Sequence, residues 1–247
     1  MTDASEAPVL PAPDASSSGP GVARLSGVFF SPVATLESIA HRPTWVAPLL
    51  LWTALSVAVT AVLLPKIDYE QLIRQAMQSR GRSIPEDRMA SIVQQQKKIG
   101  GVFGWVAGVA SPTVVSLLAA VVIWGAFKAF GWDSRFSQAF GVTTHAFLPG
   151  VLKAAFLLFL ITRQETVNPQ ALGDLLTSNL GFLVPRDASK PLHAFLQSLD
   201  IFWLWSLGLF VIGFAAAARV KRGAAAGVIV TLWLLTVAIR VGWNAIF

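Results

Sequence analysis

The stretch VAPLLLWTALSVAVTAVLL, from Val46 to Leu64, carries no charged side chain. An α-helix needs about 20 mainly apolar residues to cross a bilayer core, so this stretch, with Trp45 before it, predicts a membrane span over 45–64. Four more apolar segments of similar length follow, at residues 101–127, 136–161, 199–218 and 224–243. The sequence therefore predicts an all-α fold, a polytopic membrane bundle of five transmembrane helices.

The composition of the whole chain favours the same fold class. Of the 247 residues, 54% are hydrophobic and 13% are charged, and the mean hydropathy is +0.62. Soluble domains have about 25% charged residues, so a soluble enzyme and a disordered protein are both disfavoured. The absence of cysteine excludes a disulfide framework, a thiol nucleophile and a thiolate metal site. The net charge of +6 is not gathered into a basic groove, and loop cations in membrane proteins set topology, so we expect no nucleic acid partner.

The N-terminal residues differ from the rest of the chain. Met1 to Gly21 is rich in Ala, Pro, Ser and Gly, with three acidic residues and no basic one. Such a segment cannot bury enough apolar surface to offset the entropy lost on ordering. It also lacks the basic start and the apolar run of a signal peptide, so we expect it to be retained. We expect residues 1–23 to be a disordered tail and residues 24–247 to form the five-span membrane domain.

Three segments outside the spans have the pattern of additional interfacial helices. Ser31-Pro32 is typical of a helix start, and the apolar residues up to Pro43 share one face. This helix either lies in the membrane interface or packs on the bundle as a short connector. Residues 66–100 hold two amphipathic stripes, which predict a helical hairpin lying on the membrane surface. The leucines after Asn168-Pro169 predict another short surface helix.

Small residues and prolines within the spans predict how the helices pack and bend. Two pairs of glycines are spaced four apart, Gly104 with Gly108 in the second span and Gly223 with Gly227 at the fifth. That spacing leaves a smooth strip where a neighbouring helix can approach closely, so we interpret these glycines as packing positions. Pro112 and Pro149 each remove a backbone hydrogen bond and predict kinks in the second and third spans.

A few charges lie within or beside the spans. Lys153 is about eight residues from the end of the third span, Asp200 opens the fourth, and Arg240 nearly closes the fifth. A lone charge buried at the depth of Lys153 costs at least about 2 kcal/mol. We expect Asp200 to pair with Arg240 or Lys153 as a helix clamp; the alternative is that both cations snorkel to the interface. His145 and Pro149 precede Lys153 at spacings of four, which adds an imidazole to this candidate intramembrane charge cluster.

Patterns for catalysis and metal binding are not found. The three histidines, His41, His145 and His193, are dozens of residues apart, which disfavours a metal site on ligand count. Ser206 and His145 lie in different spans and could meet, but Ser206 lacks the Gly-x-Ser context of a serine nucleophile. We therefore expect no enzymatic activity, no metal and no cofactor.

Two stretches resemble the Yip family, the Ypt-interacting-protein type of five-span membrane protein. They are FFSPVATLESIAHRPTWVAPLLL, from Phe29 to Leu51, and RFSQAFGVTTHAFLPGVLKAAF, from Arg135 to Phe156. They look most like the bacterial branch, and the resemblance covers about residues 28–245. It implies an embedded helical bundle with a cytoplasmic N-terminus and no established catalytic residues. Eukaryotic members bind lipidated small GTPases, but the Asp-Leu-Tyr-Gly-Pro element of those members is absent here, so GTPase binding is not carried over.

The basic residues predict the orientation. With the N-terminus inside, the two short inner loops, 128–135 and 219–223, hold five basic residues in 13 positions, whereas the outer segments hold ten in 72. Because the positive-inside rule has most force in short loops, we expect the N-terminus in the cytoplasm and the C-terminus outside. Helical spans argue against an outer-membrane barrel, and together with the family resemblance they predict the bacterial plasma membrane.

Two classes of function remain. The first is a membrane scaffold or adaptor, whose partners are the lipid bilayer and an unidentified membrane or cytoplasmic protein. The second is a small transporter or channel subunit, which needs polar residues along a path shared by several spans. The first span offers only Thr53, Ser56 and Thr60, so the scaffold is the favoured interpretation.

Overall fold

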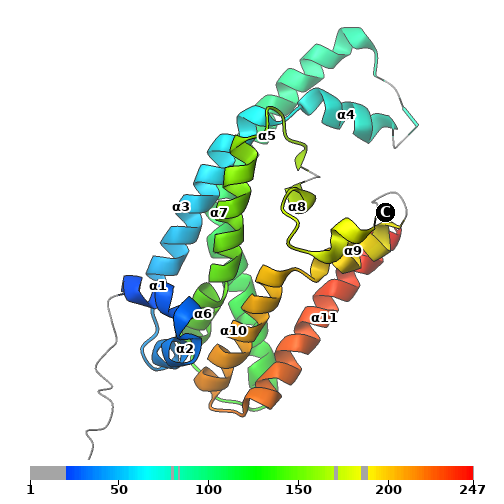
Figure 1. Ribbon diagram of the computed structural model, residues 1–247. Helices are drawn as coiled ribbons and strands as arrows, with labels where there is room; N and C mark the ends of the chain where they lie inside the picture. Colours follow the sequence, from blue (N-terminus) through cyan, green and yellow to red (C-terminus); the bar gives the residue numbers. More distant parts are fainter. Residues whose placement is uncertain (1–20, 79–80, 83, 170–171, 185–188, 247) are drawn as a thin grey trace, which may run out of the picture.

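The computed structural model describes residues 21–246, except 79–80, 83, 170–171 and 185–188. Within these residues five helical segments are long and apolar enough to cross a membrane (Figure 1). They are α3 (Val46–Leu63), α5 (Glu86–Ala129), α6 with α7 (Phe136–Ala146 and Leu148–Thr162), α10 (Ile201–Ala218) and α11 (Arg222–Ile246). The predicted all-α bundle of five spans is confirmed.

Aromatic rings fill the centre of the bundle. Phe127 from α5 meets Phe214 from α10 with ring centroids 5.2 Å apart, and Phe147, between α6 and α7, meets Phe210 at the same separation. Such pairs contribute about 0.5–1.5 kcal/mol beyond the area they bury. Since lipid tails are as apolar as these side chains, close packing of this kind is what holds the spans together.

The two ends of the bundle differ. At one end lie α1 (Gly21–Phe30), α2 (Pro32–His41) and the turn between α10 and α11. At the other end α4 (Tyr69–Gln78) and the first half of α5 project beyond the remaining spans (Figure 1). We refer to these as the α2 end and the hairpin end.

The helix α2 packs against the end of the bundle through one face. Leu36 and Ile39 are fully buried, and α2 contacts both α6 and α10. Of the two interpretations of this segment, the packed connector is the one observed. The preceding helix α1 was not predicted; it includes residues 21–23, which we had assigned to the tail, while residues 1–20 lie outside the described part of the chain.

The second span continues into the hairpin without a break. α5 has 44 residues, so it is about 66 Å long at 1.5 Å per residue, roughly twice the hydrocarbon thickness of a bilayer. A helix that is continuous with a span cannot lie in the membrane plane. The prediction of a hairpin lying on the membrane surface is therefore wrong for this arm, which continues the second span beyond the other helices with α4 folded against it (Figure 1).

The two prolines have different surroundings. α5 runs through Pro112 as one helix, so no break accompanies the kink expected there. The third span is divided at Phe147, and Pro149 lies in the first turn of α7. The missing N–H of Pro149 is tolerated in that position, because donors in a first turn have few partners within their own helix.

The glycine pairs also differ. A Cβ added to Gly108 would lie 2.5 Å from Thr60 Oγ1, and one added to Gly104 would lie 2.8 Å from Leu64 Cδ2, so α3 and α5 approach closely there. At Gly223 and Gly227 an added Cβ would meet no described atom within 4 Å.

The expected packing role of Gly223 and Gly227 is therefore wrong. The buried face of α11 contains Ala225, Val228 and Ile229 instead. Both glycines are exposed on the other side of the helix, where they contact neither α10 nor α5.

Lys66 joins the first span to the third at the hairpin end. It ends the short helix η1 (Leu64–Lys66), and its Nζ donates to the carbonyl oxygens of Ile161, Thr162 and Gln164 at 2.6–3.2 Å. These carbonyls lie at and just beyond the C-terminal end of α7, where helix carbonyls run out of intrahelical partners and the negative end of the helix dipole lies. The Lys66 ammonium supplies hydrogen-bond donors to these carbonyl oxygens and a positive charge at the negative end of the helix dipole.

The segment from α7 to α10, residues 163–199, folds back along α7; we call it the strap. It contains α8 (Leu172–Leu175), the 3₁₀ helix η3 (Leu180–Leu183) and α9 (Lys190–Ser198), which packs on α11. The short surface helix predicted after Asn168-Pro169 is confined to the four residues of α8. The strap returns the chain to the middle of α7, so α10 starts well below the end of α7 (Figure 1).

Candidate functional site

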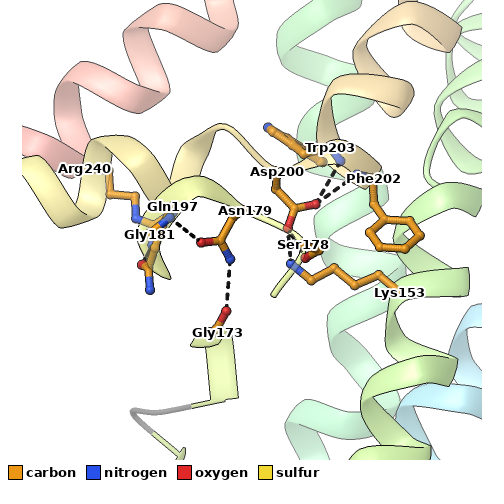
Figure 2. Close-up of polar contacts among 10 residues, drawn as sticks. All are labelled: Lys153, Gly173, Ser178, Asn179, Gly181, Gln197, Asp200, Phe202, Trp203 and Arg240. Carbon is orange, nitrogen blue, oxygen red and sulfur yellow. Dashed lines mark hydrogen bonds and ion pairs between the residues drawn. The ribbon is translucent and has the colours of Figure 1, made fainter. Parts of the chain in front are cut away.

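Lys153 and Asp200 form an ion pair where the strap meets α10. Lys153 Nζ lies 2.5 Å from Asp200 Oδ2, and Ser178 Oγ donates to the same oxygen at 2.5 Å (Figure 2). Asp200 is the N-cap of α10, and its Oδ1 accepts the backbone N–H groups of Phe202 and Trp203 at 3.0 and 3.3 Å. The carboxylate therefore has four donors.

The local sequence explains this arrangement. Aspartate is among the best N-cap residues because its carboxylate accepts the free N–H groups of the first turn, and its charge favours the positive end of the helix dipole. The side chain of Asp200 is only 7% exposed, against 29% for Lys153. A carboxylate so deeply buried requires a cation and further donors, which Lys153 and Ser178 provide.

Arg240 lies at the same site but does not reach Asp200. Its Nη2 donates to Gln197 Oε1 at 2.5 Å (Figure 2). Of the two partners predicted for Asp200, Lys153 contacts the carboxylate, whereas Arg240 is hydrogen-bonded to the neutral amide of Gln197. Arg240 therefore forms no ion pair with any residue that the structure describes.

His145 stands apart from these charges. It is fully buried in α6, where its Nδ1 donates to the carbonyl oxygen of Gly141 at 2.8 Å. Its Nε2 and the hydroxyl of the buried Ser206 each lack a hydrogen-bond partner among the described residues. The structure thus joins His145 neither to Lys153 nor to Ser206.

A cavity of about 360 Å³ lies beside the ion pair. It lies between α7, α9, α10 and α11 and is open on one side. Its polar lining includes Lys153, Gln197, Asp200, Thr236 and Arg240, and its apolar lining includes Phe202, Trp203, Trp233 and Val237. Sequence reasoning found the three charges of this cavity but not Gln197 or Trp233.

An amide that the sequence reasoning missed holds the strap together beside Asp200. Asn179 accepts the N–H of Gly181 at 2.9 Å and donates to the carbonyl oxygen of Gly173 at 3.1 Å (Figure 2). It also forms an antiparallel bridge with Asp200. The signal that was available is the Asn-x-Gly pattern, which is typical of a turn closed by an Asn side chain.

The hairpin end holds a second candidate site. Arg74 on α4 donates to Glu70 at 2.8 Å and to Glu86 at the start of α5 at 2.9 Å. Its hydrogen bonds to Glu86 and Glu70 raise the pKa of Arg74 above the usual value. Between the two helices is a groove of about 490 Å³, which Met89, Val93 and Gln94 line.

No group of three or more His, Asp or Glu residues that could hold a metal ion occurs in the described part of the chain. The three histidines are far apart: His41 binds Glu37 O at the end of α2, His145 is in α6, and His193 binds Val184 O in the strap. The polar side chains that line the cavity offer charges and hydrogen-bonding groups.

A family model of the Yip1 domain matches residues 26–242. The chain belongs to the Yip1 family. The resemblance drawn from Phe29–Leu51 and Arg135–Phe156 is therefore confirmed, and the Yip1 region contains both candidate sites.

A curated relative supports this assignment. The chain is 23% identical over 201 residues to "Membrane protein YknW" of Bacillus subtilis (strain 168), and the match covers 81% of this chain and 80% of the relative. No solved structure matches the chain significantly. The five apolar helices and this relative together identify a multi-pass membrane protein of the Yip1 family.

Proposed function

We propose that this Yip1-family protein is a non-enzymatic scaffold of the bacterial plasma membrane that binds a partner protein through the α4–α5 hairpin. The observation that carries the proposal is the length of α5, which exceeds the hydrocarbon thickness by roughly 35 Å. A helix needs no such extension to anchor a chain. The extension presents the exposed run QQQKK, residues 94–98, to the aqueous phase.

The hairpin groove has the composition of a binding surface. Its floor contains the apolar residues Met89 and Val93, and its rim contains Gln94, Lys97 and the carboxylate of Glu86. An apolar centre within a polar rim is the usual anatomy of a protein–protein interface. The double ion pair of Arg74 holds the two walls of the groove in place before a partner arrives, which lowers the ordering cost of binding.

The proposed orientation puts the hairpin on the outer side of the membrane. The short basic loops 128–135 and 219–223 both lie at the α2 end of the bundle (Figure 1). The positive-inside rule then places that end in the cytoplasm. The partner is accordingly a protein that exposes a surface outside the plasma membrane, either a membrane protein or a secreted one.

Transport has less support as an alternative. The charged cavity opens at one level of the bundle, and the carboxylate that a transported cation would need is already occupied by four donors. A transport path would also need polar groups in several spans. The polar atoms Ser116 Oγ, Thr143 Oγ1 and Ser206 Oγ are buried without described partners, and none of them lines the charged cavity.

The test is purification of the full chain in mild detergent from its bacterial host. We expect a stoichiometric partner with the wild type and its loss with Val93→Asp, which places a charge on the apolar floor of the groove. Gln96→Asp adds the same charge to the exposed face of the same helix and serves as the matched control. A stoichiometric partner that survives Val93→Asp would rule out the hairpin groove, and a solute-dependent gain in stability without any partner would favour transport.

A further inference from the structure

Among the residues that the structure describes, the charges around the cavity beside Asp200 leave one cation without a counter-charge. Lys153 and Asp200 neutralise each other, and the Asp200 carboxylate accepts from Ser178 and two backbone N–H groups as well. Arg240 pairs with the neutral amide of Gln197 and with no described carboxylate. The described lining of the cavity therefore has a net positive charge and no carboxylate left to receive a cation, so it suits an anion.

The cavity also contains a hydrogen-bond donor without an acceptor. The indole Nε1 of Trp233 is buried and has no partner among the described residues, and Trp233 lines the same cavity as Arg240. A buried N–H that lacks an acceptor is rare in proteins because its desolvation is not repaid by a hydrogen bond. A ligand that brings an acceptor oxygen next to the guanidinium of Arg240 would satisfy it.

The position of the cavity indicates which anion it meets. Arg240 lies six residues before the end of α11, or about 9 Å along the helix, and Asp200 caps the adjacent α10. Trp203 and Val237 make the remaining lining apolar. Next to the cavity, Ile239 is 71% exposed, so the surrounding surface faces lipid chains. This is the depth at which polar headgroups meet the hydrocarbon core.

We propose that this cavity binds the phosphate of an anionic phospholipid headgroup, with Arg240 as its cation and Trp233 Nε1–H as a second donor. Arginine suits a phosphate because its planar fork donates two parallel hydrogen bonds. The acyl chains of the bound lipid lie along the exposed apolar face of α11. The Lys153–Asp200 pair forms the neutral wall of the site and positions α10 beside it.

The experiment measures thermal unfolding of the full chain in mild detergent as dioleoyl phosphatidylglycerol or dioleoyl phosphatidylcholine is added. We expect phosphatidylglycerol to raise the midpoint in a saturable way and phosphatidylcholine to have little effect. Arg240→Gln should raise the half-saturating concentration of phosphatidylglycerol about tenfold, the effect of losing one charge-assisted hydrogen-bonded contact. Arg163→Gln is the matched control, because Arg163 is an exposed cation over the ring of Phe159 and lies outside the cavity.

Two further variants keep the test decisive if Arg240→Gln does not fold. Arg240→Lys retains the charge and should retain most of the selectivity, whereas Trp233→Phe removes the N–H, keeps a smaller aromatic ring, and should weaken binding several-fold. Equal shifts with both lipids, or unchanged binding in Arg240→Gln, would overturn the proposal. Saturation by inorganic phosphate alone, with displacement of phosphatidylglycerol, would assign the site to a free anion and overturn the lipid as its source.

Discussion

Removal of the negative charge of Asp200 tests whether the Lys153–Asp200 pair clamps the third span to the last two. Asp200→Asn keeps an N-cap acceptor for the first turn of α10, because Asn caps helices as well as Asp does, but it leaves the Lys153 ammonium unpaired. Breaking a fully buried pair on one side costs about 3–5 kcal/mol, and a fully exposed pair is worth less than about 1 kcal/mol.

The exposures of the two side chains decide between these limits. Asp200 is 7% and Lys153 is 29% exposed, so the ammonium regains part of its solvation when the pair is broken. We expect Asp200→Asn to cost about 2 kcal/mol, which lowers the thermal midpoint by about 4–8 °C in a chain of this size. Asp200→Ala also removes the cap and should cost about 1 kcal/mol more.

The assay is thermal unfolding in mild detergent, followed by tryptophan fluorescence. The double variant Lys153→Met with Asp200→Asn completes a thermodynamic cycle, and we expect a coupling free energy of at least about 1 kcal/mol for groups in direct contact. Additive effects of the two substitutions, or a shift below about 1 °C in Asp200→Asn, would show that the pair contributes no clamp.

Two other predictions follow from the surroundings of particular residues. Gly108→Ala should destabilise the bundle by about 1–3 kcal/mol, because its Cβ would lie 2.5 Å from Thr60 Oγ1. Gly227→Ala should be neutral or stabilising by up to about 1 kcal/mol. Thermal unfolding of both variants measures these effects, and equal effects would contradict the packing of α5 against α3. In the loop after α5, the hydrogen bond and charge of Lys128 lower the pKa of Asp133 from its ordinary 3.8. The contribution of this ion pair to folding stability is therefore present above pH 3.8 and is lost as the pH falls through the pKa of Asp133 in the folded protein. A carboxyl NMR titration should find Asp133 below 3.8 in the wild type and closer to it in Lys128→Met; an unchanged midpoint in that variant would contradict the assignment.

The five spans and the pairing of Lys153 with Asp200 could be predicted from the sequence for different reasons. Charge-free stretches of about 20 residues have few structural alternatives, so their number follows from length and hydropathy. The Lys153–Asp200 pair followed from the cost of isolated charges in a membrane. Choosing between Lys153 and Arg240 required the path of the strap, because the strap brings Gln197 to Arg240 and occupies it.

Features that depend on contacts between distant segments could not be predicted from the sequence. Residues 86–100 have the amphipathic pattern of a surface helix, yet they continue the second span, because nothing breaks the helix at Gly100-Gly101. The Gly223 and Gly227 spacing matched a packing motif, but the rotation of α11 is set by Ala225 and Ile229 on its buried face. Spacing alone does not reveal which face of a helix meets its neighbour.

The continuity of α5 also makes it a lever. Pro112 lies 26 residues from Glu86 on one continuous helix, a distance of about 39 Å. A tilt of about 10° with Pro112 as the pivot would carry the tip of the hairpin roughly 7 Å sideways, while Phe127, near the other end of the helix, would move about 4 Å. Force applied to the hairpin would thus reach the far side of the membrane with reduced travel and increased strength, through a single helix.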